Sequence, residues 1–150
     1  MRNGFTLSAF FLALNVAAGA LASDKEEAGL KTECQFLSKE LDRVQGEVER
    51  YSQEFQAFNT QLKNSSGSNG FLNRATAWTK SALFALDSNL KSVNDLYENC
   101  MCAAAKITLA DDLKRVLSQT QQKYYQLRNR AMGLKTALTT FKNKIQLNLN

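Results

Sequence analysis

The chain of 150 residues contains no histidine, the side chain that enzymes most often use as a general base and proteins most often use as a metal ligand. Neither a Ser/His/Asp triad nor a Cys/His pair can form without it. Three cysteines without histidine match no zinc-site pattern, and the sequence has no phosphate-binding glycine loop and no EF-hand pattern. We therefore expect no catalytic residue, no metal site and no cofactor, and predict that the protein is not an enzyme.

Proline is absent, and the glycines and serines concentrate in one place, residues 64–70 (NSSGSNG). Such a cluster is typical of a loop between two regular segments. We expect this loop to separate two long helices.

Apolar residues recur at alternating steps of four and three, which is the heptad pattern of helices that pack along their length. The positions before the loop are Leu30, Cys34, Leu37, Leu41, Val44, Val48, Tyr51, Phe55, Phe58 and Leu62. Those after it are Leu72, Thr76, Thr79, Leu83, Leu86, Leu90, Val93, Tyr97, Cys100 and Ala104. A third series comprises Leu113, Leu117, Thr120, Tyr124, Leu127, Ala131, Leu134, Leu138, Phe141 and Ile145. The pattern predicts helices at about residues 24–63, 71–105 and 108–146.

The third helix is expected to open at Thr108, because a threonine followed three residues later by Asp111 resembles a capping box. Short loops force neighbouring helices to run antiparallel. A three-helix core also needs faces wider than one heptad series. The flanking apolar residues that widen them are Phe36, Trp78, Ala82, Ala85, Leu96, Val116 and Met132. The predicted fold is all-α: an elongated, antiparallel, up-down-up three-helix bundle with coiled-coil-like heptad packing.

Charge is distributed unevenly between the first and third helices, which run parallel in this topology. Residues 24–63 carry nine acidic and six basic side chains, whereas residues 109–150 carry two acidic and eight basic ones. The simplest interpretation is that the two segments lie side by side and pair, which fixes their register. We therefore expect no nucleic-acid partner, despite the basic third segment.

The N-terminus resembles a secretory signal peptide. Arg2 provides the positive charge, residues 5–16 form an apolar run, and Ala20 to Ala22 supply small residues before a cleavage point. The alternative, an uncleaved membrane anchor, would have an unusually short core. We predict a signal peptide at residues 1–22, a helical bundle domain at 23–150, and a secreted or extracellular-surface location.

The cysteines can be paired from the register of the first two helices. If Leu62 lies opposite Leu72 across the loop, facing residues have numbers that add to 134, and Cys34 and Cys100 add to the same value. We predict a disulfide between them. Cys102 lies about 200° further around the helix, away from the heptad series. It is left as a free thiol or as the link to a second molecule.

Several surface positions are candidates for contacts. Asn64 begins the sequon Asn-Ser-Ser in the predicted loop and is a candidate N-glycosylation site. Trp78 and Tyr124 are expected in the core, because aromatic residues at helical spacing usually pack there. The candidate partner contacts are Ser65, Ser66, Asn69, Phe71 and Tyr125.

The segment GLKTECQFLSKELDRV resembles the start of variant surface glycoproteins of trypanosomes and of their receptor relatives. The shared pattern consists of Cys34, Leu37, Glu40 and Leu41. The resemblance implies an elongated, disulfide-stabilised and N-glycosylated helical bundle on a parasite surface, which binds host ligands or shields the membrane. Members of that group are usually longer, and many end in a hydrophobic lipid-anchor signal, whereas this chain ends in the polar KIQLNLN. Membrane association would then require a partner or an anchor outside this sequence.

We predict a non-enzymatic, exported helical bundle that acts as a cell-surface or secreted binding module for a protein partner, with a host molecule as one candidate. One alternative is a structural coiled-coil subunit that assembles into a homodimer through Cys102. Another is an amphipathic-helix lipid carrier that opens around an apolar ligand.

Overall fold

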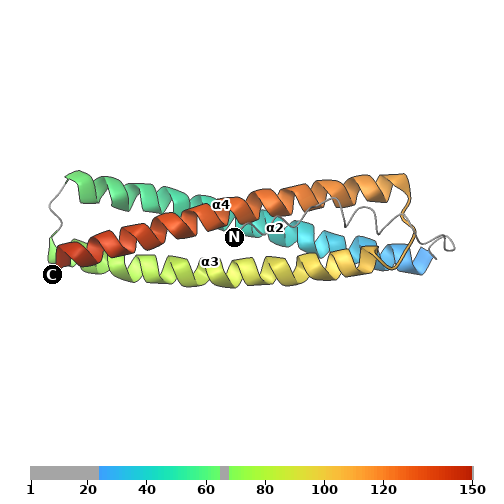
Figure 1. Ribbon diagram of the computed structural model, residues 1–150, viewed down its shortest axis with the longest axis horizontal. Coiled ribbons are helices and arrows are strands. Elements are labelled where there is room, and N and C mark those ends of the chain that lie inside the picture. The colour runs from blue at the N-terminus through green and yellow to red at the C-terminus, as the bar shows by residue number, and fades with distance from the viewer. Residues whose placement is uncertain (1–23, 65–67, 150) are drawn as a thin grey trace, which may run out of the picture.

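The computed structural model describes residues 24–64 and 68–149, and it consists of three long helices that pack along one another (Figure 1). They are α2 (Asp24–Asn64), α3 (Asn69–Ala104) and α4 (Asp111–Leu149). The predicted all-α three-helix bundle is confirmed, and each helix boundary lies within three residues of its predicted position. The predicted signal peptide, residues 1–22, lies outside the described residues.

Two short connections set where α3 and α4 begin. Ser68 caps α3, because its Oγ accepts a hydrogen bond from the Phe71 backbone N–H at 3.4 Å. The predicted capping box at Thr108 is wrong. The first helical hydrogen bond of α4 runs from the Lys114 N–H to the Ala110 carbonyl, at 3.0 Å, so the helix begins three residues after Thr108. The connection first buries Leu109 against the end of the core, and only then does the chain turn into α4.

The heptad series form the core. Leu37, Leu41 and Val44 of α2, Leu86 of α3 and Leu138 of α4 are all 0 % exposed. Burial of an aliphatic side chain of this size stabilises the fold by about 1.5–3 kcal/mol. The core of the bundle therefore follows the predicted spacing closely.

The flanking apolar residues, predicted to widen the buried faces of the helices, are buried at some positions and exposed at others. Ala82 is buried, and Trp78, Ala85 and Leu96 are partly buried. The prediction is wrong for three others, which are about half exposed: Phe36, Val116 and Met132. Phe36 lies two residues beyond Cys34, and two residues turn a helix by about 200°, so it faces away from the core that Cys34 faces. Each helix of this bundle buries a face narrower than we expected.

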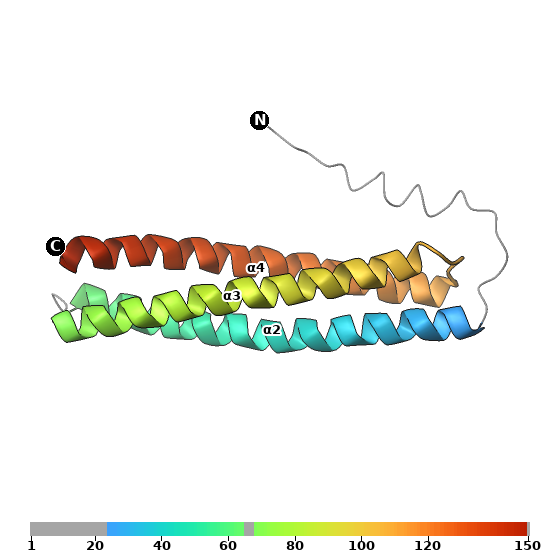
Figure 2. The ribbon, with the colours of Figure 1, turned by 90° about the horizontal axis from the view of Figure 1, so that it is seen from below.

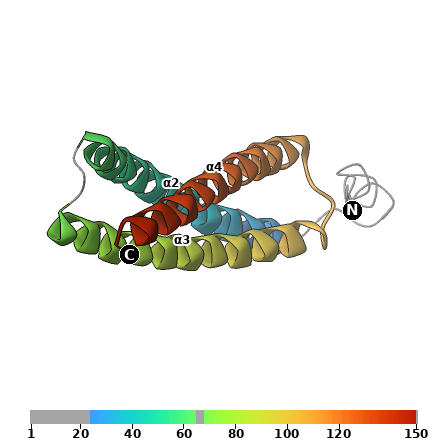
Figure 3. The same ribbon diagram turned by 60° about the vertical axis from the view of Figure 1, so that its left-hand side comes forward.

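The helices do not stay parallel to a common axis: α2 and α4 cross, as two views show (Figures 1 and 3). At the loop end, where α2 meets α3, the end of α4 lies beside α3. There Phe71, Leu72 and Ala75 of α3 are buried with Phe141 and Ile145 of α4 in a second core cluster. At the opposite end the Cys34–Cys100 disulfide holds α2 against α3, and α4 also packs on α3 through Tyr124 and Tyr97. A view turned by 90° shows that all three helices extend along the bundle (Figure 2).

Two salt bridges between α2 and α4 show the register of these helices. Asp42 pairs with Lys123, and Glu49 pairs with Arg130 at 3.4 Å. Both pairs join residues that are 81 positions apart, as expected for two parallel helices in constant register. The predicted pairing of the acidic first segment with the basic third segment is confirmed. A further bridge, Lys135 to Asp87, joins α4 to α3.

Candidate functional site

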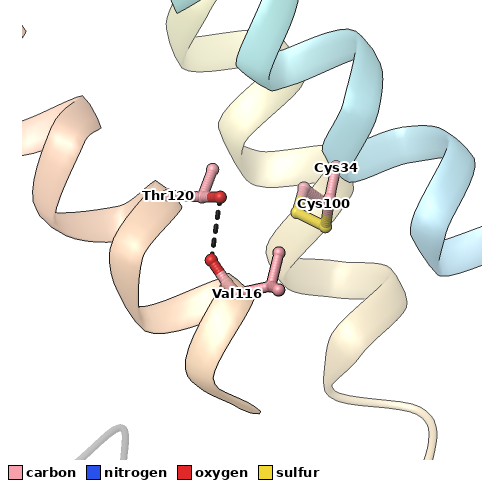
Figure 4. Close-up of a disulfide and its surroundings, with 4 residues drawn as sticks. All are labelled: Cys34, Cys100, Val116 and Thr120. Atoms are coloured by element: carbon pink, nitrogen blue, oxygen red, sulfur yellow. Dashed lines mark hydrogen bonds between the residues drawn. A yellow bond between two sulfur atoms is a disulfide. The ribbon is translucent and has the colours of Figure 1, made fainter. Parts of the chain in front are cut away.

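A disulfide closes the end of the bundle that lies far from the α2–α3 loop. It joins Cys34 of α2 to Cys100 of α3, the predicted pair, with Cα atoms 5.3 Å apart (Figure 4). Cys100 is 0 % exposed and Cys34 is 8 % exposed. Cys102, two residues further along α3, is an exposed free thiol.

Beside this disulfide, a groove of about 330 Å³ separates α2 from α4. Its lining residues are Leu30, Lys31, Cys34, Gln35, Ser38, Asp112, Leu113, Val116, Leu117 and Thr120. Val116 and Thr120 of α4 lie across from the disulfide (Figure 4). Leucine and valine side chains make the groove mainly apolar, and Lys31 on α2 and Asp112 on α4 add one charge of each sign.

The groove has the size and the lining of a small binding site. Its volume is at the lower end of the range for small-molecule sites, so it can hold one or two apolar side chains of a partner. Across residues 24–64 and 68–149, no three cysteine or carboxylate side chains come close enough together to hold a metal ion. The groove offers shape, apolar surface and opposite charges.

A polar network joins α2 to α3 near the middle of the bundle. The Arg43 guanidinium donates hydrogen bonds to Glu40 and Glu47 on its own helix and to Asn89 Oδ1 on α3, at 2.9 Å. Asn89 in turn donates to Glu47 at 2.9 Å, and Ser92 Oγ donates to Glu40 at 2.9 Å. Hydrogen bonds from Arg43, Asn89 and Ser92 therefore cross between α2 and α3.

The same network perturbs two titrations. The hydrogen bond from Arg43 is the main cause that lowers the pKa of Glu40, and it outweighs the opposing effect of burial. The hydrogen bond to Glu40 raises the pKa of Arg43. Both charged forms are favoured, so the network is an ionic clamp at neutral pH.

Three tyrosines cluster between α3 and α4 near the disulfide end. The rings of Tyr97 and Tyr124 stack with centroids 3.9 Å apart, and Tyr125 packs edge-on against both. Tyr124 donates a hydrogen bond to Asn94 at 2.6 Å, and Gln121 donates to the Tyr97 hydroxyl at 2.9 Å. Burial is the main cause that raises the pKa of Tyr97 and of Tyr124.

This cluster changes the role expected for Tyr125. Its side chain is half-buried, and its hydroxyl lies 3.5 Å from that of Tyr97. Much of the Tyr125 side chain is therefore buried within the bundle, and only its solvent-exposed part is accessible to a partner. The expectation that Tyr124 is a core residue is confirmed, since it is 6 % exposed.

The predicted contacts at the loop tip divide into three groups. Asn64, the last residue of α2, and Asn69, the first of α3, are both exposed. Ser65 and Ser66 lie outside the described residues. Phe71 is only 2 % exposed, so the prediction that it contacts a partner is wrong. Its ring packs near Phe58 and within the second core cluster, because the end of α4 reaches this level and needs an apolar neighbour.

Next to the tip, the outer face of α2 is polar and uncharged. A shallow, open depression there is lined by Gln53, Gln56, Ala57, Thr60, Gln61 and Asn64. On the inner side of the same segment, the Trp78 ring packs at a tilt against Phe58 with centroids 4.8 Å apart, and its indole N–H donates a hydrogen bond to Glu54 at 2.6 Å. The last turns of α2 therefore pack on aromatic rings on their inner side and expose amide and hydroxyl groups to solvent on their outer side.

Sequence reasoning missed the groove and the Arg43 network. A signal for the network was present, because a sum of 134 places Asn89 between Arg43 and Glu47 on the facing helix. No sequence signal marked the groove, which depends on how α2 and α4 cross.

Comparison with known proteins adds no assignment. No protein-family model, curated protein or solved structure matches this chain. Over the described residues, none of the three helices carries an apolar stretch that could cross a membrane.

Proposed function

We propose that this protein is an exported, non-enzymatic helical bundle that acts as an extracellular binding or surface module. The observation that carries the proposal is the Cys34–Cys100 disulfide, which closes one end of the bundle. Disulfides of this kind form and persist in secreted and cell-surface proteins and are rare in the reducing cytosol. The N-terminal signal-peptide pattern supports the same location.

The surface next to the α2–α3 loop is the best candidate for the binding face. Asn64 and Asn69 are exposed, and the uncharged polar face of α2 continues from them along Thr60 and Gln56. A glycan on Asn64 would leave the helix at its last residue, where it extends away from the bundle. The resemblance to trypanosome surface glycoproteins supports a cell-surface position and a host molecule as the partner.

The test is peptide mapping, without reduction, of the full chain expressed in a eukaryotic secretory host. We expect secreted protein that begins near Ser23, a peptide pair joined through Cys34 and Cys100, and a glycan on Asn64. An Asn64→Gln variant should lose the glycan mass and keep the disulfide. Protein that stays in the cell, with all three thiols free and Asn64 unmodified, would contradict the proposal.

A homodimer is a second candidate, supported by the exposure of Cys102. An unpaired, exposed cysteine in an oxidising compartment can form a bridge to a second molecule. If it does, the secreted protein runs as a covalent dimer on a non-reducing gel, and Cys102→Ser abolishes that band. A monomeric wild-type protein would leave the binding module as the better description.

A further inference from the structure

At the disulfide end, one pair of opposite charges that the α2–α4 register places level with each other, Lys31 and Asp112, forms no salt bridge. The two bridges between these helices join residues 81 positions apart, and the same spacing places Lys31 level with Asp112. Both residues are described by the structure, both are exposed and both line the groove, yet no salt bridge joins them. The groove therefore lies where a third pair would otherwise hold α2 to α4.

The two cysteines of the disulfide differ in exposure. Cys34 lines the groove and is 8 % exposed, whereas Cys100 is 0 % exposed. Thiol–disulfide exchange requires an attacking thiolate to reach the sulfur it bonds to, so access decides which sulfur is attacked. A small thiol that enters between α2 and α4 meets Cys34 first.

We propose that the Cys34–Cys100 disulfide is a redox-sensitive clasp that small thiols open through the groove by attack at Cys34, and that the unpaired charges of Lys31 and Asp112 at the groove control how fast the anionic thiolates enter. The attacking thiolate forms a bond to Cys34 Sγ as the bond between Cys34 and Cys100 breaks. Cys100 leaves as a thiolate and takes up a proton. A second thiolate then attacks the small-molecule sulfur of the mixed disulfide and releases Cys34. Two small thiols are oxidised to one disulfide while the protein disulfide gains two electrons.

Opening the clasp has a structural consequence at this end of the bundle. The disulfide at Cys34 is the covalent tie between the N-terminal part of α2 and α3, and the hydrogen bond from Ser92 to Glu40 joins the same two helices further along α2. Reduction removes the covalent tie and leaves this part of α2 attached by noncovalent contacts alone. The inference concerns the chemistry of the folded chain and holds whether or not the protein acts as a binding module.

The first test identifies the sulfur that is attacked. Folded, oxidised protein with Cys102→Ser is exposed briefly to glutathione, quenched with iodoacetamide and mapped by mass spectrometry. We expect the singly reacted species to carry glutathione on Cys34 and an alkyl group on Cys100. Glutathione on Cys100, or equal amounts on both, would overturn the proposal.

The second test measures the effect of the two charges in the same Cys102→Ser background. Lys31→Glu places two acids at the groove, which repel the incoming glutathione thiolate, so reduction should be about two- to fivefold slower, a change of the size expected for one exposed charge. Asp112→Lys places two bases there and should speed reduction, and Lys31→Glu with Asp112→Lys should return the rate close to that of the parent. Lys39→Glu, an equal charge change on an exposed position of α2 about 140° around the helix from Cys34, is the matched control.

A third variant closes the groove without changing charge. Val116 is 49 % exposed at the groove, so Val116→Phe adds volume there with little demand on the core, and it should slow reduction. Melting curves of the oxidised proteins establish that each variant is folded. Equal rates for Lys31→Glu, Lys39→Glu and the parent, or a double variant that stays slow, would refute the role of these two charges.

Discussion

At the disulfide end of the bundle, α2 is buried deeply and tied covalently to α3, whereas at the loop end the same helix is only half-buried. Leu30, Leu37 and Leu41 are at most 3 % exposed, while Phe55 and Phe58 near the loop are partly buried. The second core cluster at the loop end draws its buried members from α3 and α4, and α2 packs against its side. One heptad series along α2 thus serves two different packing arrangements.

The difference follows from the crossing of α2 and α4. Where the two helices diverge at the disulfide end, a groove opens between them, and the disulfide holds α2 on α3. Where α4 approaches α3 at the loop end, large aromatic rings pack against α2: Phe58 contacts both Phe71 and Trp78, and Phe55 contacts Phe141 edge-on. The disulfide therefore attaches α2 to the bundle at one end, and the aromatic rings attach it at the other.

Replacement of Leu41 by Asp should have the largest effect. Leu41 is 0 % exposed, so the variant places an unpaired carboxylate in the core and removes an aliphatic side chain, at a cost on the order of 5 kcal/mol. Leu62→Asp, at the half-buried loop end of the same series, is the matched control and should cost about 1–2 kcal/mol. Thermal and denaturant unfolding followed by circular dichroism measure both. Equal losses would contradict the difference between the two ends.

Removal of the disulfide should rank second. The double variant Cys34→Ser, Cys100→Ser should lose about 4 kcal/mol, the value that the chain-entropy model gives for a loop of this length, 66 positions. Loss of helicity should begin at the N-terminal end of α2. Denaturant unfolding with residue-resolved NMR checks both the size and the place. A variant that keeps the parent stability would mean that the disulfide does not hold this end.

The tyrosine cluster should give a smaller, pH-dependent effect. Tyr97→Phe removes the hydroxyl that Tyr125 and Gln121 contact, at a cost of about 1 kcal/mol. Because burial raises the pKa of Tyr97, its folded-state contribution is fully present below about pH 10 and is lost as the pH rises through that raised pKa. An ultraviolet titration of the phenols should show a late-ionising component that Tyr97→Phe reduces. A titration identical to that of the parent would contradict this assignment.

The ionic clamp at Glu40 should give the smallest effect. Because the hydrogen bond from Arg43 lowers the pKa of Glu40, its contribution is present above the ordinary glutamate pKa, about 4.3, and is lost as the pH falls through the lowered value. Glu40→Gln should therefore flatten part of the acid limb of the stability curve and cost less than about 1 kcal/mol at neutral pH. Urea unfolding between neutral and acid pH measures this. An acid limb as steep as that of the parent would exclude Glu40 as its source.

Much of the fold was predictable, because the heptad spacing constrains which residues face inward. Leu37, Leu86 and Leu138 are buried where the series put them, and the register that pairs Leu62 with Leu72 also brings Cys34 to Cys100. Periodicity within one helix and short loops between helices are local properties, and a sequence contains them directly.

The candidate site was less predictable, because it depends on how the helices cross. Phe71 lies beside the heptad series, yet it is buried, since α4 approaches α3 at the loop end. Val116 was expected in the core, yet it lies half-exposed at the groove, since α4 diverges from α2 at the other end. Asn89 was adjacent to a position of the series, and only the facing helix shows why an amide is buried there. Crossing angles follow from side-chain packing over the whole bundle and not from spacing alone.

The most direct test of the two-ended bundle is native-state hydrogen exchange of the α2 amides, measured by NMR before and after reduction of the disulfide. In the oxidised protein we expect residues 34–41 to exchange more slowly than residues 55–62. After reduction we expect exchange at 34–41 to accelerate strongly and exchange at 55–62 to change little. Uniform protection along α2 in the oxidised protein, or equal acceleration at both ends on reduction, would contradict the account.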